Sequence, residues 1–234
     1  MKHSACEEVG VKSTRIDLPD DTTTSSLLSI IDGLNNDPSV NGILIQLPLP
    51  GQINTPEILR SVSPKKDVDG FHPMNQGLLL EGTPRFVPCT PKGILTLLST
   101  YSIEIASLDA VVIGRSIDVG KPMALLLLQS DSTVTVCHSK TKNLSRKLET
   151  ADLIVSAVGK AGFITGSMIK EDTVVIDVGI SRINGKVYGD IEFDSVAKKA
   201  RALTPVPGGV GPMTIVTLIE NTLIASGLRS CIPV

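Results

Sequence analysis

The segment Ala110–Pro122, AVVIGRSIDVGKP, constrains the fold of this chain more than any other. Its first four residues, Ala110–Ile113, are all apolar, which is typical of a fully buried strand, and Gly114 then interrupts the run. From Gly120 the sequence continues into the helix-forming run MALLLLQ. A strand, a glycine turn and a helix in this order can cradle a phosphate, because a helix N-terminus offers unpaired N–H groups to an anion. The spacing is not G-x-G-x-x-G, so a turn that binds nothing stays open.

Apolar and helical runs alternate after this segment. We expect strands at Ser132–Val136, Asp152–Ala157 and Thr173–Asp177, and a helix at Lys142–Thr150. The alternation predicts a parallel sheet with helices on both faces, whose ligands bind at the carboxyl ends of the strands. The rest of the chain predicts a smaller region of mixed helices and strands. Its expected helices are Thr22–Leu34, Thr55–Val62, Pro88–Leu98 and Ile215–Ala225, and its expected strands are Lys12–Leu18 and Gly42–Leu47.

The residues after the second strand bear on the choice of coenzyme. A site for NAD usually has an acid there for the ribose 2′-hydroxyl, whereas a site for NADP has Arg or other donors for the 2′-phosphate. This chain has His138, Ser139, Lys140 and Thr141 in that place, and Arg115 lies in the first turn. Taken alone, Lys140 is better interpreted as a solvated loop charge. Together with Arg115 and Ser139 it favours NADP.

Composition argues against several other classes of protein. The 234 residues suffice for one large or two small domains, and a net charge of -2 without a basic stripe argues against a nucleic-acid partner. The apolar runs are shorter than a membrane span, and the N-terminus lacks the apolar core of a secretory signal. Cys6, Cys89, Cys137 and Cys231 are scattered, so we expect no metal site and no disulfide. A reducing compartment fits this pattern: the cytoplasm, or equally a mitochondrial or plastid matrix.

Three further segments carry candidate chemistry. Gln46 ends an otherwise apolar expected strand, so its amide needs a hydrogen-bond partner. Asp67 and Asp69 lie in the charged loop KKDVDG, for which a solvated turn is an equally good interpretation. Thr204–Thr214, TPVPGGVGPMT, is either a linker or a backbone whose adjacent glycines and prolines are shaped for close approach to a ligand.

Seven motifs follow one another from near the N-terminus to the last helix. They are GILIQLPLP (Gly42–Pro50), KDVDGFHPMNQG (Lys66–Gly77), PCTPKG (Pro88–Gly93), VVIGRSIDVGKP (Val111–Pro122), HSKT (His138–Thr141), IDVGI (Ile176–Ile180) and TPVPGGVGPMT (Thr204–Thr214). In these motifs and in their order the chain closely resembles the bifunctional methylenetetrahydrofolate dehydrogenase/methenyltetrahydrofolate cyclohydrolase family, the FolD type.

The resemblance implies an α/β fold in two domains. Residues 1–87 would form a small, N-terminally truncated catalytic domain that binds folate, with the last helix, 212–234, packed back on it. Residues 88–211 would form a Rossmann-type domain with a parallel sheet that binds NADP, and folate would lie in the cleft between the domains. The implied function is the NADP-dependent oxidation of 5,10-methylenetetrahydrofolate to 5,10-methenyltetrahydrofolate, followed by hydrolysis to 10-formyltetrahydrofolate. The implied partners are tetrahydrofolate derivatives and a second copy of the chain in a homodimer.

The resemblance also assigns residues. The implied catalytic residues are Lys2, Gln46 and Asp69, of which Lys2 is the family's lysine and Asp69 its pterin-binding aspartate. The implied coenzyme contacts are Gly114, Arg115, Ser116, Ser139 and Ile180. The implied folate contacts are Ile45, Gln46, Leu47, Asp69, Pro207, Gly208, Gly209, Val210 and Gly211.

The chain departs from the family pattern in two places. Asp118 puts a negative charge near the incoming phosphate, where the family has an apolar residue. The chain also begins inside the family's catalytic helix, without its tyrosine and the preceding helix and strand. An alternative is therefore a catalytically impaired NADP-binding or dimerisation module with little folate activity. A small-molecule NADP dehydrogenase of the shikimate type is disfavoured, because it gives no role to Gln46–Pro48 or to Asp67–Gly70.

Overall fold

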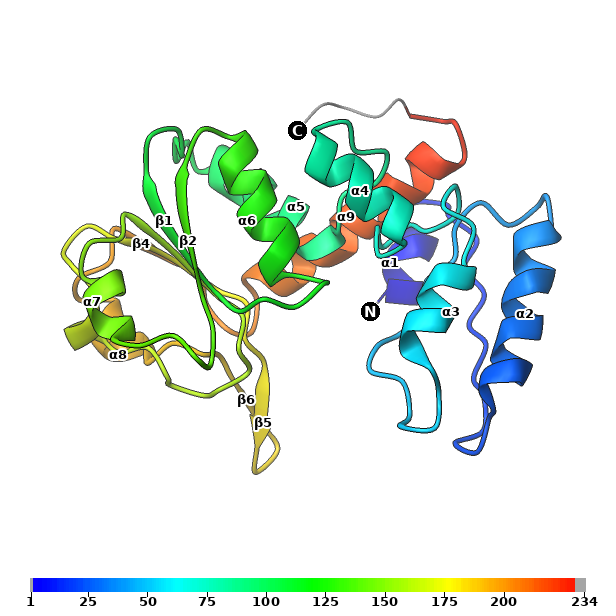
Figure 1. Ribbon diagram of the computed structural model, residues 1–234, viewed down its shortest axis with the longest axis horizontal. Helices are drawn as coiled ribbons and strands as arrows, with labels where there is room; N and C mark the ends of the chain where they lie inside the picture. Colours follow the sequence, from blue (N-terminus) through cyan, green and yellow to red (C-terminus); the bar gives the residue numbers. More distant parts are fainter. Residues whose placement is uncertain (1, 230–234) are drawn as a thin grey trace. The chain divides into compact units, whose positions relative to one another are not determined.

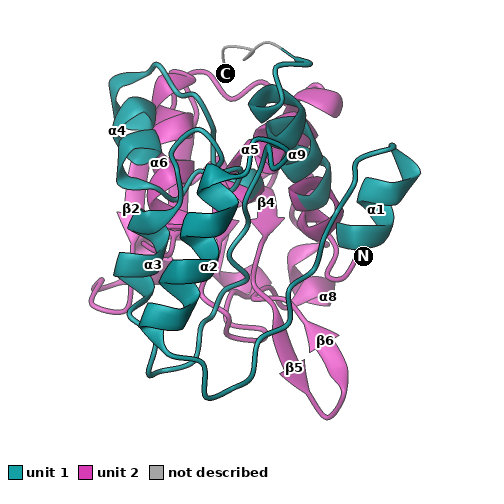
Figure 2. Ribbon diagram, turned by 90° about the vertical axis from the view of Figure 1, so that its right-hand side faces the viewer, with its two compact units in different colours: residues 1–89, 215–234 teal, residues 90–214 magenta. Residues whose placement is uncertain are grey.

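The computed structural model describes residues 2–229, which divide into two compact units. Unit 1 consists of the residues up to Cys89 together with those from Ile215, and unit 2 is Thr90–Thr214 (Figure 2). Two helices cross the boundary: α5 (Cys89–Thr100) begins in unit 1, and α9 (Val210–Ala225) begins in unit 2.

Unit 2 contains the parallel sheet that the sequence predicts. Its strands are β1 (Asp109–Ile113), β2 (Thr133–Cys137), β3 (Leu153–Ser156), β4 (Val174–Asp177) and β7 (Ala202–Leu203). They pair in the order β2-β1-β3-β4-β7, and every pair is parallel. β3 and β4 are buried along their whole length, as expected of strands covered on both faces, whereas β2 is an edge strand and is mostly exposed.

Short helices and a hairpin complete unit 2. The helices are α6 (Gly120–Gln129), α7 (Leu144–Leu148) and α8 (Phe193–Val196), with a 3-10 turn at Gly166–Met168. The antiparallel strands β5 (Ser181–Ile183) and β6 (Lys186–Tyr188) form a hairpin that extends away from the sheet (Figure 1). The sequence reading did not include this hairpin, which lies between β4 and the segment that precedes α8.

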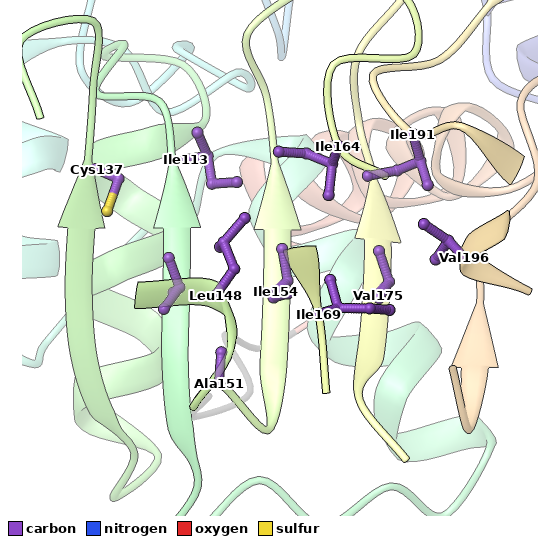
Figure 3. Packing of buried hydrophobic residues seen from close by; sticks show 11 residues of the cluster. Ile113, Cys137, Leu148, Ala151, Ile154, Ile164, Ile169, Val175, Ile191 and Val196 are labelled. Carbon is purple, nitrogen blue, oxygen red and sulfur yellow. The ribbon is translucent and has the colours of Figure 1, made fainter. Parts of the chain in front are cut away.

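The core of unit 2 packs on one face of the sheet. Figure 3 shows Ile113, Ile154 and Val175 on three neighbouring strands, with the other residues of the cluster packed around them. Leu148 of α7 and Val196 of α8 belong to the same buried cluster. Full burial of a side chain of this size contributes about 1.5–3 kcal/mol to the hydrophobic stabilisation. The cluster therefore holds the strands in register and fixes where their carboxyl ends lie.

Unit 1 is built mainly of helices. They are α1 (Lys2–Glu8), α2 (Thr24–Asn36), α3 (Thr55–Ser61) and α4 (Pro73–Glu81), together with the part of α9 from Ile215. Thr23 is the N-cap of α2, and its hydroxyl accepts a hydrogen bond from Ser26 N at 3.2 Å. Leu27 and Ile31 of α2 are buried against Ile58 of α3. None of the helices within residues 2–229 combines the length and the apolar character that a bilayer-spanning segment needs.

Two strands expected in unit 1 are not formed. Lys12–Leu18 is extended but has no strand partner among the described residues, and Gly42–Leu47 makes only a single parallel bridge, between Ile43 and Asp67. Their β-branched and apolar residues favour an extended backbone, but a strand also needs a neighbouring backbone to pair with. The sequence also predicts only a loop up to Pro73 and does not predict helix α4, which begins at Pro73.

Candidate active site

Two charged side chains of the KKDVDG loop in unit 1 are structural. Lys66 Nζ donates hydrogen bonds of 2.7–2.9 Å to the carbonyls of Leu34, Asn35 and Asp37. The buried Asp67 carboxylate accepts hydrogen bonds from Phe71 N, His72 N and Asn75 Nδ2. The loop is therefore held by a partly buried lysine and a buried aspartate, and the interpretation as a solvated turn is wrong.

Asp69 lies two residues further along this rigid loop and is half-buried. Gly70 follows with φ +71°, and a Cβ there would lie 3.0 Å from Pro88 N, so the loop cannot shift easily at that point. The buried thiol of Cys89 is hydrogen-bonded to the Asp69 side chain. Burial and the Asp69 charge together raise the pKa of Cys89 well above its usual value. Cys89 is therefore a neutral thiol, and its Sγ donates to Val68 O at 3.4 Å.

Lys2 and Gln46 are brought together in unit 1. Lys2 begins α1, and its Nζ donates a hydrogen bond of 3.1 Å to Gln46 Oε1. Gln46 Nε2 in turn donates to the carbonyl of Leu47 at 3.1 Å, which fixes the orientation of the amide. The partner that the sequence required for Gln46 is thus Lys2. The charge of Lys2 also acts on the Cys89 thiol, so this pair and Asp69 lie around the same buried group.

Asn221 of α9 supports the Asp69 loop from the C-terminal part of unit 1. Its buried Nδ2 donates to Val68 O at 2.8 Å and to Val87 O at 3.0 Å. Val68 immediately precedes Asp69, and Val87 lies two residues before Cys89. The sequence reading assigned no role to Asn221 or Cys89. The sequence signal for Asn221 was weak, because Glu220 and Thr222 flank it and a polar residue there does not stand out.

The glycine turn of unit 2 has the close backbone packing that the sequence predicts. Gly114 has φ +128°, and a Cβ there would lie 2.6 Å from the carbonyl oxygen of Ala157. A Cβ at Gly120 would collide with the carbonyl of Gly114. One expectation is wrong: the first N–H groups of α6 are not free. Ser116 Oγ accepts hydrogen bonds from Val119 N and Gly120 N, and Ser116 O accepts one from Lys121 N.

Anion recognition at this edge therefore depends on side chains. Gly114 N donates to Cys137 O at 2.9 Å, which sets the first turn beside the residues that follow β2. There His138 N donates to Thr141 Oγ1 at 2.8 Å, forming a tight turn. Arg115, Ser139 and Lys140 are all exposed on these two turns. The arrangement supplies hydroxyl and cationic donors with no carboxylate between residues 138 and 141.

The other predicted contacts of unit 2 lie at the carboxyl ends of β4 and β7. Ile180 follows β4 and is 62% exposed, which is unusual for an isoleucine and leaves its side chain available to a ligand. Thr204 Oγ1 accepts a hydrogen bond from Asp177 N at 2.8 Å, so the Thr204–Thr214 segment begins at the same edge. A Cβ at Gly209 would lie 2.5 Å from Pro205 O. The segment is thus a fixed loop and not a flexible linker.

The predicted site residues are divided between the two units. In unit 1 they are Lys2, Ile45, Gln46, Leu47 and Asp69. In unit 2 they are Gly114, Arg115, Ser116, Ser139, Ile180 and the loop Pro207, Gly208, Gly209, Val210 and Gly211.

Both units match models of the same protein family. The family model described as tetrahydrofolate dehydrogenase/cyclohydrolase, catalytic domain, matches residues 1–69, and the NAD(P)-binding domain of the same family matches residues 88–229. The bifunctional protein FolD of Methanosphaerula palustris is 59% identical over 231 residues, which cover 99% of this chain and 82% of the relative. The chain belongs to the tetrahydrofolate dehydrogenase/cyclohydrolase family.

Solved structures of this family agree in fold over nearly the whole chain. The bifunctional FolD enzyme of Campylobacter jejuni is 50% identical, with a TM-score of 0.95 over 97% of this chain and 82% of that one. The FolD enzyme of Trypanosoma brucei, solved with NADP cofactor and an inhibitor, is 36% identical, with a TM-score of 0.93 over 98% of this chain and 82% of that one.

These findings confirm the resemblance and the fold class. The relatives are named for the bifunctional enzyme, and they match along nearly the whole chain. This agreement supports the interpretation of the chain as an enzyme of the tetrahydrofolate dehydrogenase/cyclohydrolase family, and not as a catalytically impaired module. The match of residues 88–229 to the NAD(P)-binding domain also agrees with a nicotinamide dinucleotide coenzyme, which the glycine turn predicts.

Proposed function

We propose that this chain oxidises 5,10-methylenetetrahydrofolate with NADP⁺ and hydrolyses the resulting 5,10-methenyltetrahydrofolate to 10-formyltetrahydrofolate, as part of one-carbon metabolism. The observation that carries the proposal is the hydrogen bond of 3.1 Å from Lys2 Nζ to Gln46 Oε1, beside the fixed Asp69 loop. An oriented amine and an oriented carboxylate are what hydrolysis of a bound iminium carbon requires of a protein.

Lys2 has the role of general base in the hydrolysis. Water adds to the methenyl carbon, and Lys2 Nζ takes a proton from that water, which leaves a hydroxyl on the carbon. The hydroxyl then loses its proton as its oxygen becomes the formyl C=O, the bond from the carbon to N5 of the folate breaks, N5 takes up a proton, and the formyl group stays on N10. The Gln46 amide holds Nζ through its oxygen, while its own Nε2 is fixed on Leu47 O. The lysine therefore keeps one orientation during proton transfer.

Asp69 has the role of recognising the folate. Its carboxylate accepts hydrogen bonds from the amino group of the pterin, and the Cys89 thiol and the backbone around Gly70 hold it in place. Ile45 and Leu47 flank Gln46 and contact the ring system. From unit 2, the loop Pro207–Gly211 contributes backbone contacts to the same substrate. Both reactions use the same bound pterin, so Asp69 serves both.

Gly114–Ser116 and Ser139 hold the coenzyme. The residues fit NADP because a Cβ at Gly114 or Gly120 would fill the turn, and because Arg115, Ser139 and Lys140 supply donors with no acid between residues 138 and 141. Asp118, in the same turn as Arg115, is the one opposing charge that the sequence places there. When bound, NADP⁺ accepts a hydride from the methylene bridge of the folate. Arg115 forms charge-assisted hydrogen bonds with the 2′-phosphate, and Ile180 packs against the coenzyme. The T. brucei relative, solved with NADP, supports this choice.

The two units have separate roles in this proposal. Residues 1–87 bind folate, the part of α9 from Ile215 packs back on them, and residues 88–211 bind NADP. The enzyme acts as a homodimer in the cytoplasm. Exposed aromatic and aliphatic side chains on and near the β5–β6 hairpin support self-association; they are Phe163, Ile183, Tyr188 and Phe193. The free thiols of Cys6, Cys89 and Cys137 agree with a reducing compartment.

The direct test is an assay of the purified chain with 5,10-methylenetetrahydrofolate and each coenzyme. We expect NADPH formation with NADP⁺, a much weaker reaction with NAD⁺, and accumulation of 10-formyltetrahydrofolate in both the coupled reaction and a reaction started from the methenyl compound. Formation of NADPH without the formyl product would leave only the dehydrogenase. No reaction with either folate would contradict the proposal.

A further inference from the structure

Two buried carboxylates of unit 2 have no role in the function described so far. Asp177 ends β4, and Asp190 follows the β5–β6 hairpin; the two side chains are 3% and 0% exposed. Ser156, which ends β3, is the register partner of Asp177. Both carboxylates therefore lie at the carboxyl ends of neighbouring parallel strands, which is the edge where such sheets bind ligands.

Asp190 fixes the loop that follows β3. Its Oδ2 accepts hydrogen bonds of 2.8 Å from Ser156 Oγ and from Val158 N. Its Oδ1 accepts one of 2.7 Å from Lys160 N. The backbone on either side of Asp190 is itself anchored, because Ile164 N donates to Asp190 O and Glu192 N donates to Ile164 O.

Asp177 fixes the loop that follows β4 and closes the base of the hairpin. Its Oδ1 accepts hydrogen bonds from Gly179 N at 3.1 Å and from Asp190 N at 2.9 Å, and its Oδ2 accepts one from Ile191 N at 3.0 Å. The segment between these donors contains Ile180, the proposed coenzyme contact. Asp177 and Asp190 are thus linked in one network that spans both loops.

The network has no cation within the described residues, since neither carboxylate forms an ion pair there. Burial raises the pKa of Asp177, while the N–H donors oppose that rise. Two acidic residues in this setting carry a desolvation cost that an uncharged pair would avoid. A cost of this kind favours a role in the site over a role in stability alone.

The glycines next to the pair show how closely it is fitted. A Cβ at Gly179 would collide with the Asp190 carboxylate, and one at Gly189 would collide with the Asp177 carboxylate. The N–H groups of Gly179 and Lys160 point at the carboxylates, so the carbonyls of the same planar peptides, those of Val178 and Gly159, point away from them. Neither carbonyl accepts a hydrogen bond within residues 2–229.

We propose that Asp190 and Asp177 are positioning residues for the coenzyme: they hold the loops 157–160 and 178–180 at the edge of the sheet and thereby set the affinity for NADP⁺. This inference rests on the proposed function, because it requires that edge to bind NADP⁺. Donors reach both oxygens of the Asp190 side chain, so both terminal atoms at this position must be hydrogen-bond acceptors. An asparagine in its place sets an NH₂ group against at least one N–H in either orientation of the amide.

The test compares three variants by calorimetric titration with NADP⁺ and by amide hydrogen exchange. Asp190→Asn is expected to raise the Kd for NADP⁺ at least tenfold and to speed exchange at Lys160 and Gly179. Ser156→Ala, which removes one hydroxyl donor, is expected to raise it about three- to tenfold. Asp152→Asn is the matched control, because Asp152 accepts from Asp109 N at the opposite end of β3. It is expected to leave the Kd within twofold of wild type. In steady state, Asp190→Asn is expected to raise KM for NADP⁺ and leave KM for folate unchanged.

Each outcome is informative. A folded Asp190→Asn variant with a Kd within twofold of wild type would overturn the inference, because the pair would then serve stability alone. Should Asp190→Asn fail to fold, Ser156→Ala decides: a raised Kd supports the inference and an unchanged one overturns it. A wild-type chain that does not bind NADP⁺ would overturn the proposed function and this inference together. Wild-type binding with unchanged variants would overturn the inference alone.

Discussion

At the scale of single residues, Asp67 and Asp69 show that one residue type can have two roles within three positions. Asp67 is buried and accepts two hydrogen bonds from its own loop and one from Asn75 of α4, whereas Asp69 is half-buried and shares a hydrogen bond with Cys89. Sequence alone could not separate them, because the difference lies in which carboxylate faces the interior. Only the resemblance to a family assigned the functional role to Asp69.

Asp69→Asn is expected to lower both activities together by about ten- to a hundredfold, because one charge-assisted hydrogen bond to the pterin contributes about 1.5–3 kcal/mol. The affinity for NADP⁺ is expected to stay within twofold of wild type. Asp67→Asn is the contrasting variant and is expected to lower the free energy of unfolding. Loss of only one of the two activities in Asp69→Asn would argue against recognition of a shared pterin.

Arg115→Ala is expected to weaken NADP⁺ binding by about ten- to a hundredfold, for the same energetic reason applied to the 2′-phosphate. Binding of NAD⁺, which lacks that phosphate, should change much less. Lys121→Ala, an exposed cation on the first turn of α6, controls for a general change in charge. Titration of both coenzymes measures the difference, and an equal loss for both would contradict the assignment of Arg115.

At the scale of elements, the sequence predicted the buried strands well and the extended segments of unit 1 poorly. The strands β1, β3 and β4 contain continuous apolar runs. Short runs of this kind indicate a segment that is buried on both faces, either a strand of a parallel sheet or part of a buried helix. Lys12–Leu18, with its alternating character, and the apolar run Gly42–Leu47 also carry local strand signals, but they find almost no partner backbone among the described residues. Pairing depends on distant parts of the chain, so local pattern cannot predict it.

Helix α9 stabilises the Asp69 loop through Asn221. Asn221→Ala is expected to lower the free energy of unfolding by about 2–3 kcal/mol, because it removes the amide donor to Val87 O and leaves Val68 O with only the weaker thiol donor of Cys89 among the described residues. Thr222→Ala is the matched control, since the Thr222 hydroxyl bonds only the carbonyl of Leu218 in its own helix. Urea unfolding measures both variants, and equal losses would contradict the special role of Asn221.

Asp152 joins the amino ends of β1 and β3 and gives a pH-dependent contribution. The hydrogen bond from Lys170 and that from Asp109 N lower the pKa of Asp152, so the folded chain favours the carboxylate. Its contribution is present above the unfolded pKa, near 3.8, and is lost as the pH falls through the lower folded pKa. Asp152→Asn is therefore expected to cost about 1 kcal/mol near pH 7, and the difference from wild type should shrink below about pH 4.

Urea unfolding of Asp152→Asn and wild type across that range tests this account. A difference that stays constant from neutral to acidic pH would show that the carboxylate charge contributes nothing. Lys170→Met is a companion variant, because it removes the main cause of the lowered pKa while leaving Asp152 in place. Lys170→Met should make the free energy of unfolding less dependent on pH, as Asp152→Asn does.

At the scale of the whole molecule, seven motifs in family order predicted the fold class, the enzyme and the coenzyme class. Motifs carry that information because glycine turns, cationic loops and proline-rich segments have local physical causes. Asp177 lies in the motif IDVGI, but its link to Asp190 could not be found in this way, since the hairpin separates the two residues in sequence. Nor could the role of Cys89, which depends on a hydrogen bond to Asp69.

The central claim is that Lys2, oriented by Gln46, takes the proton from water during hydrolysis. The most direct measurement is methenyltetrahydrofolate hydrolysis by wild type, by Lys2→Met and by Lys12→Met, an exposed lysine as control. We expect Lys2→Met to lose at least about a hundredfold in turnover, because general base catalysis contributes about 10²–10⁴-fold, while its affinity for NADP⁺ is retained. Lys12→Met should hydrolyse the substrate as wild type does. Turnover of Lys2→Met within twofold of wild type would contradict the account.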